Sequence, residues 1–448
     1  MHGRRCILQA SLGAVLLCSA CAIPSPPSPA VVPGRASLLP PVPASGSPGR
    51  KAIKHIIVVI QENRTLVNIF AGFPGADAPT FGYLHDGTKV ALTPSTFDDR
   101  GSLPHGFLSA VYDWQNGAMN GFDVAAAGSG NSPRLPYRYL RRNLVAPYWD
   151  MATRYTLSDR MFQTEWGGSF TAHLDLIAGT TYLSPTVAEA DFPNALPWGC
   201  DAPPGTTTVT VTYPSFERGI GPFPCFDQFR TMADTLDAAG ISWKYYAPPV
   251  TPHNGWSSFD AIRRVRYGKD WHNVVSPETT IIADAASGNL PAVAWVVPDQ
   301  RNSDHEGSKS STGPSWVSAI VNTVGASKDW DSTAIFVLWD DWGGWYDDAA
   351  PPKGDYFGPG LRVPCIIISP YAKVHHVSHT VYEFGSILKF VENTFGLPTL
   401  GYTDAKASDM IDSFDFDHAP RPFVPIKAPL PARHFLNETP SLRAPDDD

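Results

Sequence analysis

The 448-residue sequence predicts an α/β fold, in which helices sandwich a central, mostly parallel β-sheet and long loop-rich insertions interrupt it. Three observations predict this class. Several runs of β-branched and apolar residues have strand length and no polar alternation, which is typical of strands buried on both faces of a parallel sheet. Segments with apolar residues at helical spacing separate these runs. Hydrophobic residues make up 43% and charged residues 17% of the chain, the balance of a globular protein.

The chain is expected to begin with an export signal. Residues 1–21 combine a basic start, MHGRRC, with a short apolar run that ends in small residues. Cys21 resembles the modified cysteine of a bacterial lipoprotein, so a lipid tether at Cys21 and ordinary cleavage nearby are the alternatives. Residues 22–50 have the Pro, Ser and Gly bias of an extended tether, and the folded domain is expected to span 51–448. Such a protein would be periplasmic, held at the outer membrane, or secreted.

The first half of the domain is expected to contain one strand, two insertions and one helix. IKHIIVVIQEN, residues 53–63, is a continuous apolar run that ends in polar residues, so it predicts a buried strand. Residues 73–140 and 185–225 are rich in Gly, Pro and aromatic residues and are expected to be ordered insertions. Residues 226–240 have helical spacing and a glycine stop.

The second half is expected to alternate strands and helices. AVAWVVPD at 292–299, STAIFVLWDD at 332–341 and RVPCIIISPYA at 362–372 have the same form as the first strand. Residues 315–327 and 381–396 have apolar residues at helical spacing.

Cysteine usage and charge restrict the function further. Export would permit disulfides, and Cys200 and Cys225 lie in loop-like stretches where they could pair, stabilising the fold by roughly 3 kcal/mol on the chain-entropy model. Cys365 lies in an apolar run and is expected to be a buried free thiol. The net charge of −9, with no block of Lys or Arg, argues against a nucleic-acid partner.

Side chains that can bind a cation follow three of the predicted strands. The carboxyl ends of parallel strands meet at one edge of a sheet, and ligands bind there. Two adjacent carboxylates at that edge repel each other if both are ionised, and a divalent cation with oxygen ligands removes this repulsion. The side chains concerned are Glu62, Asn63, Asp299, Asp304, His305, Asp340 and Asp341.

Each of these signals also has a simpler structural interpretation. Asn63 could occupy a left-handed turn position after its strand. Asp340 could be a helix N-cap with Asp341 as its solvated neighbour, and Ser169 in GGSFTAHLDLIAG could be the N-cap of the next helix. The stretch NSDHEGS could be a surface loop. Together, however, they supply the carboxylate, amide, hydroxyl and imidazole groups that metal-assisted ester hydrolysis needs.

Five stretches, in this order, resemble the bacterial phosphoesterase family. They are HIIVVIQENRT, GGSFTAHLDLIAGT, PDQRNSDHEGS, AIFVLWDDWGGWYDD and a C-terminal stretch that begins GLRVPCIIISPYAK. The family includes phosphatidylcholine-type phospholipases C and an acid phosphatase of related architecture, and it is related to the alkaline-phosphatase superfamily. The resemblance extends from Ile53 to Phe416 and implies an alkaline-phosphatase-like fold.

The resemblance implies a role for each matching residue. Glu62 and Asn63 match a Glu-Asn pair that helps to hold the metal ion. Asp340 and Asp341 match the acidic pair that completes the metal site. Ser169 matches the Ser or Thr nucleophile, which also contacts the metal ion.

Asp304 and His305 match the Asp-His pair of the family's catalytic loop, in which the histidine donates to a phosphoryl oxygen or assists the leaving group. The family's Pro-Asn after the nucleophile is Thr171-Ala172 here, so an amide near the phosphate is missing. His173 is expected to replace that amide in part, as a substrate-binding residue.

Other positions depart from the family pattern. Its Asp-His near the first strand is Val67-Asn68, and its histidine after the glycine pair is Asp348. A second family histidine, expected between the nucleophile and the Asp-His loop, has His253 and His272 as candidates.

The aromatic stretch after the acidic pair has two interpretations. Trp342 and Trp345 could form a wall beside a choline or acyl group through cation–π attraction. Core packing beneath the Gly343-Gly344 turn is the favoured interpretation, with the glycines allowing a sharp bend.

The activity implied is hydrolysis of a phosphoester in two steps, through a phosphorylated Ser169, with a divalent metal ion as cofactor. Oxygen-rich ligation fits several cations, so the identity of the metal ion stays open. The substrate could be a phospholipid, as for a phospholipase C, or a small phosphomonoester, as for an acid phosphatase. The alternative function is that of an exported lipoprotein that binds phosphorylated ligands with little or no turnover.

Overall fold

A computed structural model describes residues 48–98, 102–251, 257–305, 308–352, 358–439 and 441. These residues belong to one unit of the chain, Leu38–Asp448. The other unit, Met1–Ser37, lies outside the described residues, and so do the predicted signal, Cys21 and nearly all of the predicted tether.

A nine-stranded sheet forms the centre of the described part of the chain, in the order β12-β11-β13-β1-β14-β15-β6-β16, with β17 also paired to β6. Neighbouring strands are parallel except at β15, which is antiparallel to both β14 and β6. The predicted α/β class with a mostly parallel sheet is confirmed. The strands are β1 His55–Gln61, β6 Thr156–Phe162, β11 Trp243–Tyr246, β12 Val274–Val275, β13 Val293–Val296, β14 Thr333–Trp339, β15 Arg362–Ile368, β16 His376–Ser378 and β17 Tyr382–Glu383.

All four predicted strands are present in this sheet. The buried runs of β1, β13 and β14 lie next to one another and parallel, as their apolar composition predicts. β15 is buried along its whole length, as expected, but it runs in the opposite direction. The chain between β14 and β15 forms no helix in its described residues, so it turns back beside β14 instead of crossing over the sheet.

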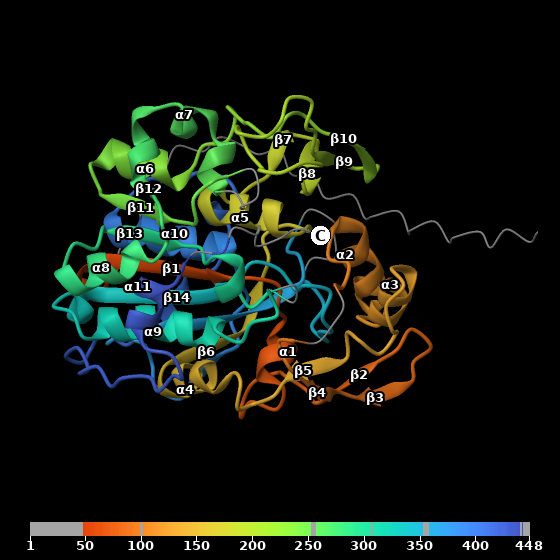
Figure 1. Ribbon diagram of the computed structural model, residues 1–448, viewed down its shortest axis with the longest axis horizontal. Coiled ribbons are helices and arrows are strands. Elements are labelled where there is room, and N and C mark those ends of the chain that lie inside the picture. Colours follow the sequence, from red (N-terminus) through yellow and green to blue (C-terminus); the bar gives the residue numbers. More distant parts are fainter. Residues whose placement is uncertain are drawn as a thin grey trace, which may run out of the picture. The chain divides into compact units, whose positions relative to one another are not determined.

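Helices cover both faces of the sheet. Figure 1 shows α4 and α9 on one side of the strands and α5 and α6 on the other. α8, α11 and α4 contact α9, whereas α6 and α10 contact α5. The helices are α1 Leu66–Phe70, α2 Phe107–Trp114, α3 Phe122–Gly128, α4 Ala146–Arg154, α5 Ser169–Ala178, α6 Met232–Ala239, α7 Arg263–Arg266, α8 Thr280–Ser287, α9 Gly313–Gly325, α10 Phe384–Phe395 and α11 Ala432–Asn437.

The three predicted helices are α6, α9 and α10. α6 is shorter than predicted because it begins at Met232, where Thr231 and Asp234 form a capping box. It ends at Gly240, which adopts the left-handed conformation expected of a glycine stop.

The two predicted insertions contain small sheets of their own. The second forms an antiparallel sheet in the order β10-β9-β8-β7, in which β7 lies just before the predicted bounds. The first contributes two pairs of short strands together with α2 and α3. The strands are β2 Phe81–Tyr83, β3 Lys89–Ala91, β4 Thr93–Ser95, β5 Arg138–Leu140, β7 Tyr182–Ser184, β8 Val187–Asp191, β9 Val209–Thr212 and β10 Glu217–Ile220.

Candidate active site

Four polar segments meet at the carboxyl edge of the central sheet. β14 and β13 flank β1, and all three run in one direction. β6 has the same direction, because two antiparallel steps through β15 separate it from β14. The strand ends therefore bring together the predicted residues, and β6, a strand that the residue pattern did not predict, brings the serine. The segments are Glu62–Asn63 after β1, Asp304–His305 after β13, Asp340–Asp341 after β14 and Ser169 after β6.

Asp340 fixes the end of β1 against the end of β14. Its Oδ1 accepts hydrogen bonds from the backbone N–H of Asn63, at 2.9 Å, and of Asp341, at 2.7 Å. Asn63 has a φ of +59°, so the left-handed turn is present, and it directs the N–H of Asn63 at Asp340. With Oδ1 held by two backbone groups, Oδ2 of Asp340 is the oxygen that faces His173, at 3.4 Å.

Ser169 is the first residue of α5 and is buried. Gly168, not Ser169, is the N-cap, so the interpretation of Ser169 as a capping residue is wrong. The Ser169 hydroxyl donates to Oδ2 of Asp341 at 3.1 Å, and Oδ1 of Asp341 accepts the backbone N–H of Gly343 at 2.6 Å. The nucleophile predicted from the sequence thus lies against one of the two predicted acids, at a helix N-terminus that favours negative charge.

His173 lies on the same face of α5 as Ser169, because four residues separate them. Its Nε2 is 3.4 Å from Oε1 of Glu62 and 3.4 Å from Oδ2 of Asp340. The predicted contact with substrate stays a prediction, and the observed neighbours are the two carboxylates. The spacing of four residues between Ser169 and His173 is a signal in the sequence that could have predicted this placement. Ala172 lies on the same helix and supplies no side-chain amide, so the amide of the family pattern is missing here.

Glu62, His173 and Asp340 form one electrostatic unit. Burial and then the charge of Asp340 raise the pKa of Glu62 to about 8. Burial would lower the pKa of His173, but the charge of Glu62 and the close contacts with Asp340 and Glu62 hold it well above its usual range. Burial would raise the pKa of Asp340, but the close contact with His173 and its charge lower it overall. The two carboxylates therefore need positive charge beside them.

The residues present fit a divalent cation. One ligand atom each from Glu62, His173 and Asp340 lies within 4.8 Å of the others, and all three residues are buried. Both carboxylate oxygens of Glu62, Oδ1 of Asn63 and Oδ2 of Asp340 are buried without a hydrogen-bond donor. Because nearly all buried polar atoms in proteins have a partner, unpartnered carboxylate oxygens in a group of ligand atoms this close together indicate a cation site.

His105 is a site residue that the sequence did not reveal. It comes from the first insertion, and its Nε2 lies 3.1 Å from Nδ2 of Asn63. Its Nδ1 lies 2.8 Å from the carbonyl oxygen of Leu103, so Nδ1 donates and Nε2 accepts. The ring centroids of His105 and His305 are 6.1 Å apart. A lone histidine in a Gly- and Pro-rich stretch carries no spacing signal. The candidates for a further site histidine were His253 and His272 instead.

A buried arginine fixes the loop that carries His305. Arg64 donates through Nε and Nη2 to the carbonyl oxygen of Asp304, at 2.9 and 2.6 Å. Oδ2 of Asp304 accepts from the Tyr148 hydroxyl at 2.7 Å and from Nε1 of Trp339 at 3.2 Å. Burial, partly offset by the bond from Tyr148, raises the pKa of Asp304 to about 6. These contacts fit a positioning role for Asp304, and its participation in catalysis stays a prediction.

The positions that depart from the family pattern make structural contacts. Asp348 accepts from Nη2 of Arg362 at 2.9 Å, and Asp347 accepts from Nε of the same arginine at 2.8 Å. Asn68 donates to the carbonyl oxygen of Arg138 at 2.8 Å. These side chains hold the surrounding loops together.

The aromatic stretch is part of the core, in agreement with the packing interpretation. Trp342 and Trp345 are buried, and Nε1 of Trp342 donates to Asp113 at 2.8 Å. Gly343 and Gly344 have φ of +59° and +70°, so the backbone bends as expected.

The remaining predicted residues lie away from this centre or outside the description. Cys200 and Cys225 form a disulfide, and Cys365 is a buried free thiol whose pKa is raised by burial. His272 is exposed in a short 3-10 helix, and His253 lies outside the described residues.

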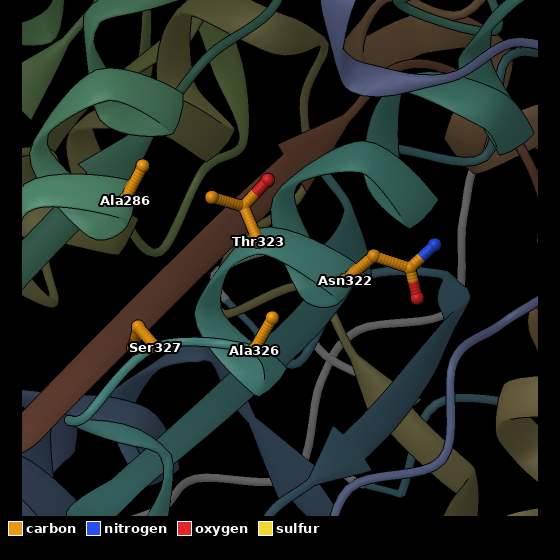
Figure 2. Close-up of a pocket in the computed structure, with 5 residues that line it drawn as sticks. All are labelled: Ala286, Asn322, Thr323, Ala326 and Ser327. Atoms are coloured by element: carbon orange, nitrogen blue, oxygen red, sulfur yellow. The ribbon is translucent and has the colours of Figure 1, made fainter.

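A surface pocket of about 350 Å³ lies far from these residues. Figure 2 shows that α8, α9 and the turn after α9 line it. The C-terminal end of α9 leads into the amino end of β14, whereas the site lies at the carboxyl end. Its lining residues are Ala286, Asn322, Thr323, Ala326 and Ser327, which offer no acid, base or metal ligand set.

The profile described as Phosphoesterase family matches residues 53–398, most of the chain. The chain belongs to the phosphoesterase family. It is 27% identical over 448 residues to phospholipase C B of Mycobacterium tuberculosis, covering 83% of this chain and 80% of that protein. It is 23% identical over 447 residues to the non-hemolytic phospholipase C of Pseudomonas aeruginosa, covering 84% of this chain and 59% of that protein. This phosphoesterase is therefore an enzyme of the phosphoric-ester hydrolase class with phospholipase C relatives.

Solved structures also resemble the phosphoesterase. A protein in the alkaline phosphatase superfamily from Vibrio parahaemolyticus superimposes with a TM-score of 0.35 and 12% identity, covering 83% of this chain and 73% of that chain.

Within the described residues, every helix is too short or too polar to cross a lipid bilayer.

Proposed function

We propose that the phosphoesterase is a metal-dependent phospholipase C that cleaves the phosphodiester of a phospholipid headgroup through a phosphorylated Ser169. The observation that carries this proposal is the hydrogen bond of 3.1 Å between the Ser169 hydroxyl and Asp341, next to buried oxygens that have no donor. The named phospholipases C among the relatives support the substrate class.

In the first step, the Ser169 oxygen forms a bond to phosphorus as the bond to the diacylglycerol oxygen breaks. The serine proton passes to Asp341, which already accepts its hydrogen bond. His305 lies on the loop held by Arg64 and protonates the departing alkoxide. The N-terminus of α5 stabilises negative charge on the phosphoryl oxygens.

In the second step, His305 takes a proton from water as the water oxygen forms a bond to the same phosphorus. The Ser169–phosphorus bond breaks, and the proton held by Asp341 returns to the serine oxygen, which releases the phosphorylated headgroup and restores both side chains. Glu62, Asn63, Asp340 and Asp341 would hold a divalent cation, which when bound would lower the pKa of the nucleophile and offset charge on the phosphoryl group. Asn63 is kept in place by Asp340 at its backbone and His105 at its side chain.

Replacement of the nucleophile tests the proposal. We expect Ser169→Ala to abolish release of diacylglycerol from phosphatidylcholine without unfolding the protein, since only a hydroxyl is removed. Ser287→Ala, at an exposed serine at the other end of the fold, is the control and is expected to keep full activity. Activity of Ser169→Ala equal to that of this control would reject the nucleophile.

A substrate panel separates the alternatives. Diacylglycerol from phosphatidylcholine supports phospholipase C activity, whereas phosphate from p-nitrophenyl phosphate alone would show an acid phosphatase. Tight binding of both compounds with no product would show a binding protein that has lost turnover.

Export belongs to the same proposal and rests on residues 1–50 alone. Fractionation of cells that express the full chain is expected to find it outside the cytoplasm. A lipid label that is incorporated by the full chain and lost in Cys21→Ser would establish the tether.

A further inference from the structure

One nitrogen atom faces the oxygen-rich cation site. His173 extends from α5 so that Nε2 lies 3.4 Å from an oxygen of Glu62 and 3.4 Å from an oxygen of Asp340. The atoms around it are carboxylate and amide oxygens of Glu62, Asn63 and Asp340. The chemistry of the imidazole therefore bears on which cation the site accepts.

The two separations that involve His173 match the spacing of ligands around a small tetrahedral ion, and all three ligand atoms lie within 4.8 Å of one another. Two ligands at about 2.1 Å from zinc, at the tetrahedral angle, are about 3.4 Å apart. Two neighbouring ligands at about 2.1 Å from magnesium, in an octahedron, are about 3.0 Å apart. Both observed separations at His173 are 3.4 Å. Calcium, with ligands at about 2.4 Å, would fit the distance, but it takes oxygen ligands.

A second arrangement of the same residues would have a different geometry. If a protonated His173 replaced the cation, its N–H would approach one carboxylate to about 2.7–2.9 Å, the length of a charge-assisted hydrogen bond. Nε2 instead lies equally far from both oxygens. Buried oxygens of Glu62 and Asp340 have no hydrogen-bond donor, and ligand atoms of these two residues and of His173 lie within 4.8 Å of one another. The observed distances therefore fit three ligand atoms around a cation better than an ion pair between His173 and one carboxylate.

We propose that His173 is a ligand of the cation and that it makes the site select a transition metal ion, with zinc as the expected occupant, over magnesium and calcium. This inference rests on the proposed metal dependence of the phosphoesterase. Imidazole suits zinc, cobalt, nickel and copper, whereas carboxylate and amide oxygens alone also suit magnesium, calcium and manganese. Glu62 and Asp340 provide the charge, and His173 provides the selectivity.

Cobalt binding tests the ligand directly, without an activity readout. The full chain is stripped of metal ions with a chelator and titrated with Co²⁺, and the visible d–d absorption is recorded. We expect His173→Asn to change this spectrum and to weaken cobalt and zinc binding by at least about 100-fold, because loss of an outer partner alone typically weakens binding about 10–100-fold. Magnesium affinity is expected to stay within about tenfold, since magnesium prefers oxygen ligands.

Two controls accompany this comparison. His272→Asn removes an exposed histidine and is expected to leave the spectrum and the affinities unchanged. Urea denaturation of metal-free His173→Asn shows whether the variant is folded. If it is not, one equivalent of Cu²⁺ bound to the wild-type chain is examined by pulsed electron paramagnetic resonance, in which a coordinated imidazole gives a distinct nitrogen modulation. That modulation is expected to disappear in Glu62→Gln.

The outcomes separate the inference from the proposed function. An unchanged cobalt spectrum and affinity in His173→Asn, or no imidazole modulation from the wild-type site, would overturn the inference alone. A metal-free wild-type chain that binds no divalent cation and still hydrolyses its substrate would overturn the proposed metal dependence as well.

Discussion

Gly343 permits the close approach between the two halves of the site, and Gly343→Ala tests that contact. Gly343 has a φ of +59°, and a Cβ at this position would lie 2.4 Å from the carbonyl oxygen and 2.7 Å from the Cβ of Asn63. Ordinary contact between such atoms begins at about 3.4 Å, so the turn must move by about 1 Å. The same turn anchors Asp341 through the Gly343 N–H, at 2.6 Å. The shift therefore moves the carboxylate that accepts the Ser169 proton.

The expected magnitude has two parts. A left-handed conformation disfavours a residue with a Cβ by roughly 1–2 kcal/mol, and overpacking adds roughly 1–3 kcal/mol, so we expect the free energy of unfolding to fall by about 2–5 kcal/mol. A misplacement of about 1 Å near the chemistry lowers turnover by about 100-fold. Gly240→Ala is the matched control, because Gly240 has a φ of +67° and open space where its Cβ would lie. It is expected to lose only the first part and to keep full turnover.

Urea denaturation and hydrolysis of phosphatidylcholine by both variants provide the measurements. The control removes the backbone contribution, so the difference between the variants reports the contact with Asn63. Equal stability and equal turnover of Gly343→Ala and Gly240→Ala would refute this reasoning.

Three further predictions concern the surrounding structure. The double variant Cys200→Ser, Cys225→Ser opens a loop with a sequence separation of 25 and should lower the free energy of unfolding by roughly 3 kcal/mol under oxidising conditions. Reductant should lower the stability of the wild type to that of the variant, and equal stability of the two under oxidising conditions would contradict this prediction. Burial raises the pKa of Asp304 to about 6 from 3.8, so the folded wild type binds its proton more tightly than the unfolded chain. It is expected to lose about 2 kcal/mol of stability as the pH rises from 4 to 7. Asp304→Asn should lack this loss, which denaturation at both pH values measures. A difference in stability between variant and wild type that is the same at both pH values would disprove the prediction. Trp342→Phe removes the donor to buried Asp113 and should lower the free energy of unfolding by about 1–3 kcal/mol. Adding Asp113→Leu should restore part of this loss. A double variant less stable than Trp342→Phe alone would contradict the stabilising role of this hydrogen bond.

Local sequence determined the parts of this phosphoesterase that depend on neighbouring residues along the chain. The apolar runs specified β1, β13 and β14, because strands covered on both faces have no polar alternation. The polar residues after those runs could be placed at one edge, since parallel strands end together. The positive φ of Asn63 and of Gly343 followed from the residue types that tolerate it.

Tertiary structure decided what depends on distant segments. The direction of β15 followed from how the chain returns after β14, and apolar composition does not encode direction. His105 reaches Asn63 from an insertion whose path is set by many weak contacts, so no local pattern identified it. His173 was recognisable as a polar residue near the serine, but its role depends on Glu62 and Asp340, which come from two other strands. Sequence thus specified which groups stand at the strand ends, and only packing decided which of their atoms face one another, because side-chain direction depends on contacts across the fold.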